Sequence, residues 1–349
     1  MRQVIVRALS SAVPPHVVGQ DEAAHWARRI FGERYAAFER MAPVFANAGI
    51  ERRYAARPIE WYSQPQGLAH SNAAYLEMAT ALFIEATRLA LDQTGMDAKD
   101  IDTIVTVSST GIATPSLEAL VHAALGLRAD VARVPVFGLG CAGGVTGMAL
   151  AARLASAQPG SNVLLVVVEL CTLSCRVDVL SKANIVATAL FGDGAAAAIF
   201  STEGPGLAAI GGAGEHLWPD TLDIMGWDVD GDGLGVIFAQ SIPGFVASQL
   251  RGAVDGWLAR EGLGKDDIAR FICHPGGAKV IDALESSLDL AQGTLDIERA
   301  VLAGYGNMSA PTVLFVLERV LARGLPGRAA MLALGPGFTA SMLLVEPLS

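Results

Sequence analysis

The segment VPVFGLGCAGGVTGMALAARLASA, residues 134–157, carries three structural signals in succession. Its first four residues predict a short strand over 134–137. The glycines at 138, 140, 143 and 144 predict a tight loop, and the small residues after them predict a helix to about Ala157. Cys141 lies where the loop meets the helix, and backbone N–H groups at a helix N-terminus stabilise a thiolate. The segment therefore predicts an α/β unit with a candidate nucleophile.

Similar units flank this segment. Residues 72–94 carry apolar side chains at helical spacing and end at Gly95, which predicts an amphipathic helix. The runs 100–107 and 161–169 predict strands, and the second is apolar enough to be buried on both faces. We also expect a strand at 271–274 and a helix at 312–323. Strands alternating with helices favour a layered α/β fold.

The second half of the chain repeats a pattern of the first. Residues 95–104 align without gaps on residues 262–271, and each segment links a helix to a strand. In this register His274 takes the position of Val107. The match predicts two similar halves, which we place at residues 1–205 and 206–349. No low-complexity linker separates them, so we expect them to pack closely together.

The composition excludes several classes of protein. The 349 residues carry a net charge of −10, which disfavours a general nucleic-acid binder, and 52% of them are hydrophobic, which predicts a large core. The N-terminal residues lack the continuous apolar region of a signal peptide. The uncharged stretch 329–345 is interrupted by Gly335-Pro336-Gly337, which predicts two strands and a turn. We therefore expect a soluble, cytoplasmic protein without integral membrane association.

Three further patterns resemble ligand sites and are set aside. Cys171 and Cys175 have ligand-like spacing, but no second Cys/His pair accompanies them, so zinc is not expected. Residues 138–143 satisfy GxGxxG, yet no acidic residue follows about 20 residues later, as a dinucleotide site requires. Residues 228–233 resemble the start of a calcium loop, but Ala239 occupies the position of the required Glu. No metal site is therefore expected.

Two residues complete a candidate site around Cys141. His274 ends a predicted strand and precedes Pro275-Gly276-Gly277, a location where ligand sites of α/β folds occur. Asn307 lies in a glycine-rich turn before the helix at 312–323. Alone, the cysteine would be read as an inert core residue and the asparagine as a turn former. Together, the three suit nucleophilic acyl transfer, with His274 stabilising a thiolate and His274 and Asn307 donating to an oxyanion or enolate.

The motifs around these residues resemble those of the type III polyketide synthases, the chalcone-synthase-like branch of the thiolase superfamily. The resemblance extends from about Arg40 to the C-terminus and rests on five motifs: Gly140-Cys-Ala-Gly-Gly144, Ala189-Leu-Phe-Gly-Asp-Gly194, His274-Pro-Gly-Gly277, Gly306-Asn-Met-Ser309 and Gly335-Pro-Gly-Phe338. Residues 223–243 look like bacterial alkylresorcinol and alkylpyrone synthases, which use long fatty acyl starters. The sister enzyme ketoacyl synthase III typically has Gln-Ala-Asn after its histidine, where this chain has Pro275-Gly276-Gly277.

The resemblance implies an α/β fold of the layered αβαβα thiolase type, a homodimer, and no cofactor beyond the substrates acyl-CoA and malonyl-CoA. It implies that Cys141 carries the starter as a thioester while His274 and Asn307 hold the enolate of decarboxylated malonyl-CoA. Repeated extension and cyclisation then give an alkylresorcinol or alkylpyrone. The implied substrate-binding residues are Phe191, the gatekeeper, with Ser109, Thr110, Thr114, Ser174, Val236, Ser309, Gly335, Pro336, Gly337 and Phe338. Gly276 and Gly277 are implied to shape the CoA tunnel.

The chain departs from the plant members of the family at several positions. Val236 stands where they carry a second gatekeeping Phe, and Thr114 where a Met reaches across the dimer. Of their three CoA-binding cations only Arg40 is retained, so Arg52, Arg53 or Lys279 is expected to compensate. Seven arginines between residues 28 and 57 fit either a solvated face paired with glutamates or a landing site for polyanionic CoA.

Two alternative functions remain open at this point: a single-round condensing enzyme resembling ketoacyl synthase III, and a non-catalytic thiolase-fold protein that binds acyl-CoA. The sequence leaves the starter length, the number of extensions, the cyclisation route and delivery by an acyl carrier protein undecided.

Overall fold

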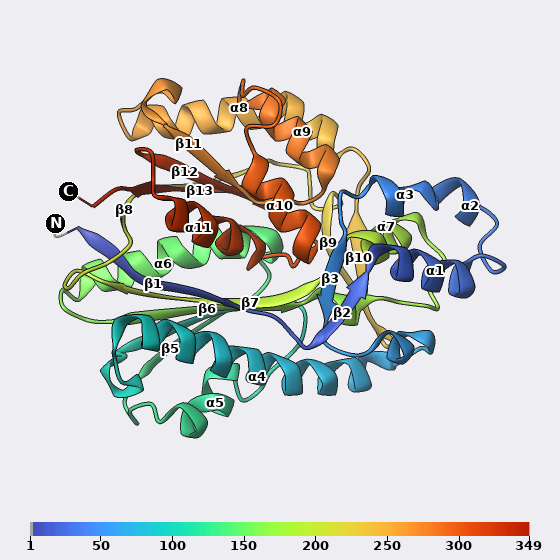
Figure 1. The fold of residues 1–349 in the computed structure, drawn as a ribbon, viewed down its shortest axis with the longest axis horizontal. Helices are drawn as coiled ribbons and strands as arrows, with labels where there is room; N and C mark the ends of the chain where they lie inside the picture. The colour runs from blue at the N-terminus through green and yellow to red at the C-terminus, as the bar shows by residue number, and fades with distance from the viewer. Residues whose placement is uncertain (1–2, 349) are drawn as a thin grey trace.

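Two helices lie between two β-sheet layers in the computed structural model, which describes residues 3–348 (Figure 1). These central helices are α6 (Gly143–Ala157) and α11 (Thr312–Arg323), and each contacts strands of both layers. Helices α4 (Gly67–Thr94) and α5 (Leu117–Leu125) cover the outside of one layer. Helices α8 (Ile242–Arg260) and α9 (Ala278–Ser287) cover the outside of the other. The arrangement confirms the predicted αβαβα fold.

The strands follow one hydrogen-bonded order, β11-β12-β13-β8-β1-β7-β6-β4-β5. Their bounds are β1 (Val4–Ala12), β4 (Thr103–Val107), β5 (Ala132–Val136), β6 (Val163–Leu170), β7 (Asp193–Ser201), β8 (Ala208–Leu217), β11 (Arg270–Cys273), β12 (Ala329–Gly335) and β13 (Thr339–Glu346). Strand β4 runs parallel to β5 and β6, β11 runs parallel to β12, and the other neighbours are antiparallel. Within the described residues, three residue pairs between β1 and β8 join the two layers.

The remaining elements gather mainly at one end of the layers, on the right in Figure 1. They are β2 (His16–Gly19), α1 (Gln20–Phe31), α2 (Phe38–Met41), α3 (Pro43–Asn47), β3 (Arg52–Ala55), α7 (Lys182–Leu190), β9 (Met225–Asp230), β10 (Gly233–Phe238) and α10 (Asp296–Tyr305), with 3₁₀ turns η1 (Ile59–Ser63), η2 (Ala98–Asp100), η3 (Gly140–Ala142), η4 (Cys171–Ser174) and η5 (Lys265–Asp267). Strands β9 and β10 pair only with each other. The candidate site lies at this end.

Local sequence signals predicted several elements correctly. Helix α4 ends at Gly95, whose left-handed φ of 66° is the backbone conformation that glycine favours at a helix end. Strand β6 is buried over its whole length, as its continuous Val/Leu run predicts. The predicted helix at 312–323 has the bounds of α11, and the uncharged stretch 329–345 forms β12, a turn and β13. No helix within residues 3–348 is long and apolar enough to cross a bilayer.

The internal repeat is present in the structure. Gly95 and Gly262 both have positive φ, and the turns η2 and η5 follow them at the same interval before β4 and β11. Val107 is the last residue of β4, and His274 directly follows β11. Val107 packs against α6 so closely that a Cβ on Gly143 or Gly147 would come within 3.0 Å of its side chain.

A testable consequence concerns the contact between the central helices. A Cβ on Gly144 would come closer than 3.0 Å to the carbonyl oxygen of Ala310 and to the side chain of Val313. We expect Gly144→Ala to lower the free energy of unfolding by about 1–3 kcal/mol, because α6 and α11 must separate, as measured by urea denaturation.

Gly252→Ala is the matched control. Gly252 lies in α8, and a Cβ there meets nothing within 4 Å. The substitution should leave stability unchanged or raise it by up to about 1 kcal/mol. Equal stability of Gly144→Ala and the wild type would show that the two helices are not in this close contact.

Candidate active site

Cys141 lies in the turn η3 at the entrance to α6, and it is buried. Gly140 directly before it has a positive φ of 45°, and a Cβ there would come within 3.0 Å of the ring of Pro336. A Cβ on Gly335 would likewise collide with the loop around Leu139 and Ala142. The Gly335-Pro336-Gly337 turn therefore packs directly on the loop that holds the predicted nucleophile, and both loops need glycine for this approach.

His274 and Asn307 line the same cavity as Cys141, which has a volume of about 20 Å³. The backbone N–H of His274 donates to the carbonyl of Leu332 (2.8 Å), which continues the parallel ladder past the end of β11. Neither ring nitrogen of His274 has a hydrogen-bond partner among the described residues. Asn307 is oriented by two bonds: its Oδ1 accepts from the backbone N–H of Ser309 (2.8 Å), and its Nδ2 donates to the carbonyl of Gly276 (3.1 Å).

Burial governs the protonation of these groups. It raises the pKa of the Cys141 thiol to about 11, although hydrogen bonds from Ser309 and Asn307 act in the opposite direction. It lowers the pKa of His274 to about 3. Both groups are therefore neutral at neutral pH. A thiolate at Cys141 requires a compensating positive charge, and the unpartnered imidazole of His274 can supply it by accepting the thiol proton.

A second cavity of about 40 Å³ adjoins Cys141 and Asn307 on the other side. Among the predicted residues it is lined by Ser109, Thr110, Phe191, Val236, Ser309 and Pro336. Val236 on β10 pairs with Trp227 on β9, and the Trp227 ring meets the Phe191 ring edge-on at 6.4 Å between centroids. Sequence reasoning missed Trp227, Met225 and Phe238, which line this cavity because the β9–β10 hairpin folds over it.

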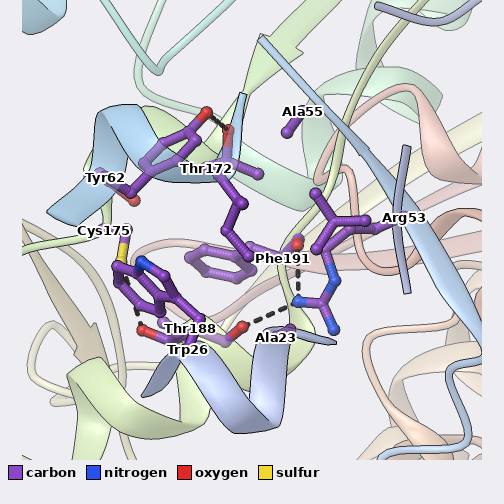
Figure 2. Close-up of a pocket in the computed structure, with 13 residues that line it drawn as sticks. Ala23, Trp26, Arg53, Ala55, Tyr62, Thr172, Cys175, Thr188 and Phe191 are labelled. Atoms are coloured by element: carbon purple, nitrogen blue, oxygen red, sulfur yellow. Dashed lines mark hydrogen bonds between the residues drawn. The ribbon is translucent and has the colours of Figure 1, made fainter. Parts of the chain in front are cut away.

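Phe191 also borders a third cavity, of about 60 Å³, which Figure 2 shows. Trp26 on α1 and Tyr62 on η1 line it, together with Arg53, Thr172, Ser174, Cys175 and Thr188. Most of the remaining lining is aliphatic: Val18, Ala23, Ala55, Ile59 and Ala187. The aromatic ring of Phe191 thus belongs to the linings of both this chamber and the cavity beside Cys141. Ser174 lies in the chamber beyond Phe191.

Glu169 is a polar residue of the site that sequence reasoning missed. It is fully buried at the end of β6, and its carboxylate accepts from the backbone N–H of Ser109 (2.9 Å) and from the hydroxyl of Thr110 (2.7 Å). Burial raises its pKa to about 7. The Ser109 hydroxyl in turn accepts from the backbone of Gly140 (3.4 Å), next to Cys141. The one available signal was a lone acidic residue in an otherwise apolar strand.

Four predicted substrate-binding residues do not line these cavities directly: Thr114, Gly335, Gly337 and Phe338. Thr114 is exposed and lines none of the three in this chain. Phe338 is buried against Trp218 and Phe245 instead. Gly337 has a positive φ of 70° and contributes to the turn that carries Pro336. Gly335, Gly337 and Phe338 belong to the turn segment around Pro336, which does line the cavity beside Cys141.

The predicted CoA-binding cations divide into two groups. Arg40 on α2, Arg52 on β3 and Lys279 on α9 are exposed, and none of them makes an ion pair with the described residues. The expectation for Arg53 does not fit its position. It is 3% exposed, and its guanidinium group donates to backbone carbonyls inside the protein, so it offers no N–H to a phosphate at the surface.

The segments set aside as ligand sites have other roles. Residues 228–233 form the turn of the β9–β10 hairpin, where Asp230 pairs with Arg176 (2.8 Å). Cys171 and Cys175 are free thiols. Over residues 3–348, no group of three His, Cys, Asp or Glu side chains is arranged to hold a metal ion.

Comparison with known proteins decides the family. The model of the N-terminal domain of chalcone and stilbene synthases matches residues 2–204, and that of the C-terminal domain matches residues 210–349. The chain belongs to the chalcone and stilbene synthase family. It is a type III polyketide synthase and therefore an acyltransferase, which carries out decarboxylative Claisen condensation on CoA thioesters without a further cofactor.

Several relatives align over nearly the whole chain. A 1,3,6,8-tetrahydroxynaphthalene synthase from Streptomyces peucetius subsp. caesius is 40% identical, covering 99% of this synthase and 93% of its own chain. A putative chalcone synthase from Bacillus subtilis is 35% identical over 97% of both. The solved structure of the 1,3,6,8-tetrahydroxynaphthalene synthase from Streptomyces coelicolor A3(2) superposes with a TM-score of 0.93, at 29% identity and 99% coverage of each chain.

Substitution of the three central residues of this synthase separates their predicted roles. We expect Cys141→Ala to take up no acyl group from acyl-CoA, as measured by intact-protein mass spectrometry. His274→Ala and Asn307→Ala should lose malonyl-CoA decarboxylation by about 10²–10³-fold, because each removes a donor to the developing enolate.

Cys273→Ala is the control for the first variant, because Cys273 is another fully buried thiol. It should still take up one acyl group. An acyl group on Cys141→Ala would show that another residue is the nucleophile. Wild-type decarboxylation in both His274→Ala and Asn307→Ala would remove them from the assigned role.

Proposed function

We propose that this synthase extends an acyl starter held on Cys141 by several malonyl units and then cyclises the product. In loading, the Cys141 Sγ attacks the acyl carbonyl and the bond to the CoA sulfur breaks. The CoA thiol leaves with the proton that His274 took from Cys141. In this proposal residues 1–205 form the half with the nucleophile, and residues 206–349 form the half with His274 and Asn307.

Extension uses the same cavity. Malonyl-CoA loses CO₂ and leaves an enolate, whose oxygen receives hydrogen bonds from His274 and Asn307. The enolate carbon attacks the Cys141 thioester, a C–C bond forms, and the Cys141 thiolate is released. Two observations support these roles. His274 is neutral, and its ring nitrogens have no hydrogen-bond partner among the described residues. The side-chain amide of Asn307 is oriented by its hydrogen bonds with Ser309 and Gly276.

The apolar chamber beyond Phe191 is the observation that carries the proposed starter class, a long fatty acyl-CoA. Its lining is mainly aliphatic and aromatic, and it shares the Phe191 ring with the cavity beside Cys141. Each methylene buried there contributes about 0.8 kcal/mol, so a matching acyl tail gains strongly over a short one. With this starter, the products are an alkylresorcinol after aldol closure or an alkylpyrone after lactonisation.

A second candidate is the formation of a polyhydroxylated naphthalene without an alkyl chain. It is favoured by the relative that is 40% identical, which is a 1,3,6,8-tetrahydroxynaphthalene synthase. A naphthalene skeleton has ten ring carbons, and two-carbon units alone can supply all of them. The product would therefore contain no fatty acyl tail. The two candidates therefore differ in whether the starter chain appears in the product.

For CoA we propose a binding surface formed by Arg40, Arg52 and Lys279, whose side chains are exposed and free of ion pairs with the described residues. The chain just after α3 lies beside the first residue of α9, because a Cβ on Gly49 would lie 3.2 Å from the Cβ of Ala278. Gly276 and Gly277 between this surface and His274 leave room for the pantetheine arm. We place the reaction in the cytoplasm, where acyl-CoA and malonyl-CoA are found.

We further propose a homodimer. Ile112, Phe137 and Val229 are more than half exposed, and they line a groove of about 220 Å³ that also contains Ser109 and Thr110 of the site. Large apolar side chains at a groove that opens toward the active site suit burial by a second copy of the chain.

A product assay tests the starter class. The enzyme is incubated with isotope-labelled malonyl-CoA and acyl-CoA starters from two to sixteen carbons, and products are weighed by mass spectrometry. We expect alkylated triketide or tetraketide products that increase with starter length. Tetrahydroxynaphthalene as the product with every starter would establish the second candidate, and single-extension β-keto acids would establish a ketoacyl synthase III-like reaction.

The same assay on Ser174→Met tests the chamber. Ser174 is buried and lines it, so the larger side chain should shift the preferred starter to fewer carbons, while loading of acetyl-CoA serves as the internal control. An unchanged preference for long starters would place the acyl chain elsewhere.

The dimer proposal predicts the behaviour of Phe137→Glu, which puts a charge in the expected interface. We expect this variant to elute as a monomer in size-exclusion chromatography with light scattering, whereas Leu207→Glu, at another exposed apolar residue, keeps the wild-type mass. A wild-type enzyme that is monomeric at micromolar concentration would contradict the proposal.

A further inference from the structure

Arg53 is a buried cation whose two terminal nitrogens each make two hydrogen bonds, while its Nε has no partner among the described residues. Its Nη1 donates to the carbonyls of Thr188 (2.8 Å) and Phe191 (3.0 Å), as the dashed lines in Figure 2 show. Its Nη2 donates to the carbonyl of Ala189 (2.9 Å) and to the side-chain oxygen of Gln20. Gln20 is itself fixed by donating from Nε2 to the carbonyl of Phe45 (2.8 Å).

The three carbonyls belong to the end of α7, which stops at Leu190. Terminal carbonyls of a helix have no partner within the helix, and the helix dipole places partial negative charge there. Arg53 satisfies these carbonyls with a buried positive charge. Burial lowers its pKa to about 10, which still leaves it protonated at neutral pH. The planar guanidinium has donors on separate nitrogens in a fixed geometry, which suits carbonyls that lie on three different residues.

The end of α7 is also tied to the other half of the molecule. The backbone N–H of Asn307 donates to the carbonyl of Leu190 (2.8 Å), and that of Gly192 donates to the carbonyl of Asn307 (3.0 Å). The short segment 190–192 is therefore held by Arg53 on one side and by Asn307 on the other. Gly192 and Gly306 fit beside Arg53 because a Cβ on either would lie within 3.5 Å of the Arg53 Cβ.

We propose that Arg53 is a positioning residue, which fixes the Phe191 ring and the Asn307 amide together through the backbone of residues 190–192. This inference rests on the role proposed above for Asn307 in holding the enolate. Among the described residues, no hydrogen bond joins Arg53 to Cys141 or His274. Its loss should therefore affect decarboxylation and the choice of product chain, but not the uptake of the acyl group by Cys141.

The test compares Arg53→Lys with Arg88→Lys. Arg88 on α4 donates from Nη2 to the carbonyl of Ala124 (3.1 Å) in the last turn of α5, so it performs similar chemistry far from the site. Three quantities are measured on each folded variant: the rate of acyl loading by mass spectrometry, kcat and KM for malonyl-CoA decarboxylation, and the distribution of product lengths.

We expect Arg53→Lys to lower kcat for decarboxylation about tenfold or more, since a small displacement of a reacting group has effects of this size. KM for malonyl-CoA and the rate of loading should stay within about twofold, and the products should change in length. Arg88→Lys should match the wild type in all three quantities. Gln20→Met, which removes one of the two acceptors of the Arg53 Nη2, should show the same pattern in weaker form and serves if Arg53→Lys does not fold.

Two outcomes overturn the inference. Loading and decarboxylation that fall in equal proportion in Arg53→Lys would indicate a purely structural role, and unchanged decarboxylation in both Arg53→Lys and Gln20→Met would indicate none. Asn307→Ala is measured in parallel. If it abolishes decarboxylation while Arg53→Lys does not, this inference fails and the proposed function stands. If Asn307→Ala decarboxylates normally, the proposed function itself fails.

Discussion

Two backbone hydrogen bonds join the halves of this synthase at its candidate site, from Asn307 to Leu190 and from Gly192 to Asn307. Peptide groups are planar and stiff, so this short bridge fixes the backbone of Asn307 and that of Phe191 relative to each other. A Cβ on Gly192 or Gly306 would collide with backbone there, so side chains cannot intervene. The other features of the site depend on this bridge: the shared wall of the two cavities, the orientation of Asn307, and the burial of Arg53 beside it.

The second constraint is electrostatic. Cys141, His274 and Glu169 are buried, and burial shifts the pKa of each toward the neutral form. Buried reactive groups stay uncharged until the reaction places an opposite charge or a hydrogen-bond donor beside each new charge. In the proposed mechanism, the thiolate arises beside an imidazolium, and the enolate arises beside two hydrogen-bond donors.

Local sequence signals predicted much of the fold and only part of the site. Helix α11, strand β6 and the loop around Cys141 follow from periodicity and glycine placement, which depend on near neighbours in the chain. Arg52 and Arg53 show where this reasoning ends. They alternate across β3, so one side chain is exposed and the next is buried, and no local pattern predicted β3 itself. Trp227 and Glu169 were missed because only tertiary packing brings their strands to Cys141.

The correspondence between Val107 and His274 connects the repeat to the chemistry. Both positions end the equivalent strand of their half, and Val107 is wedged against α6 where Gly143 and Gly147 make room for it. In one half this position packs against α6, the helix that follows Cys141; in the other it is occupied by His274. A side chain larger than valine at position 107 would have to displace α6, so the two equivalent positions are not interchangeable.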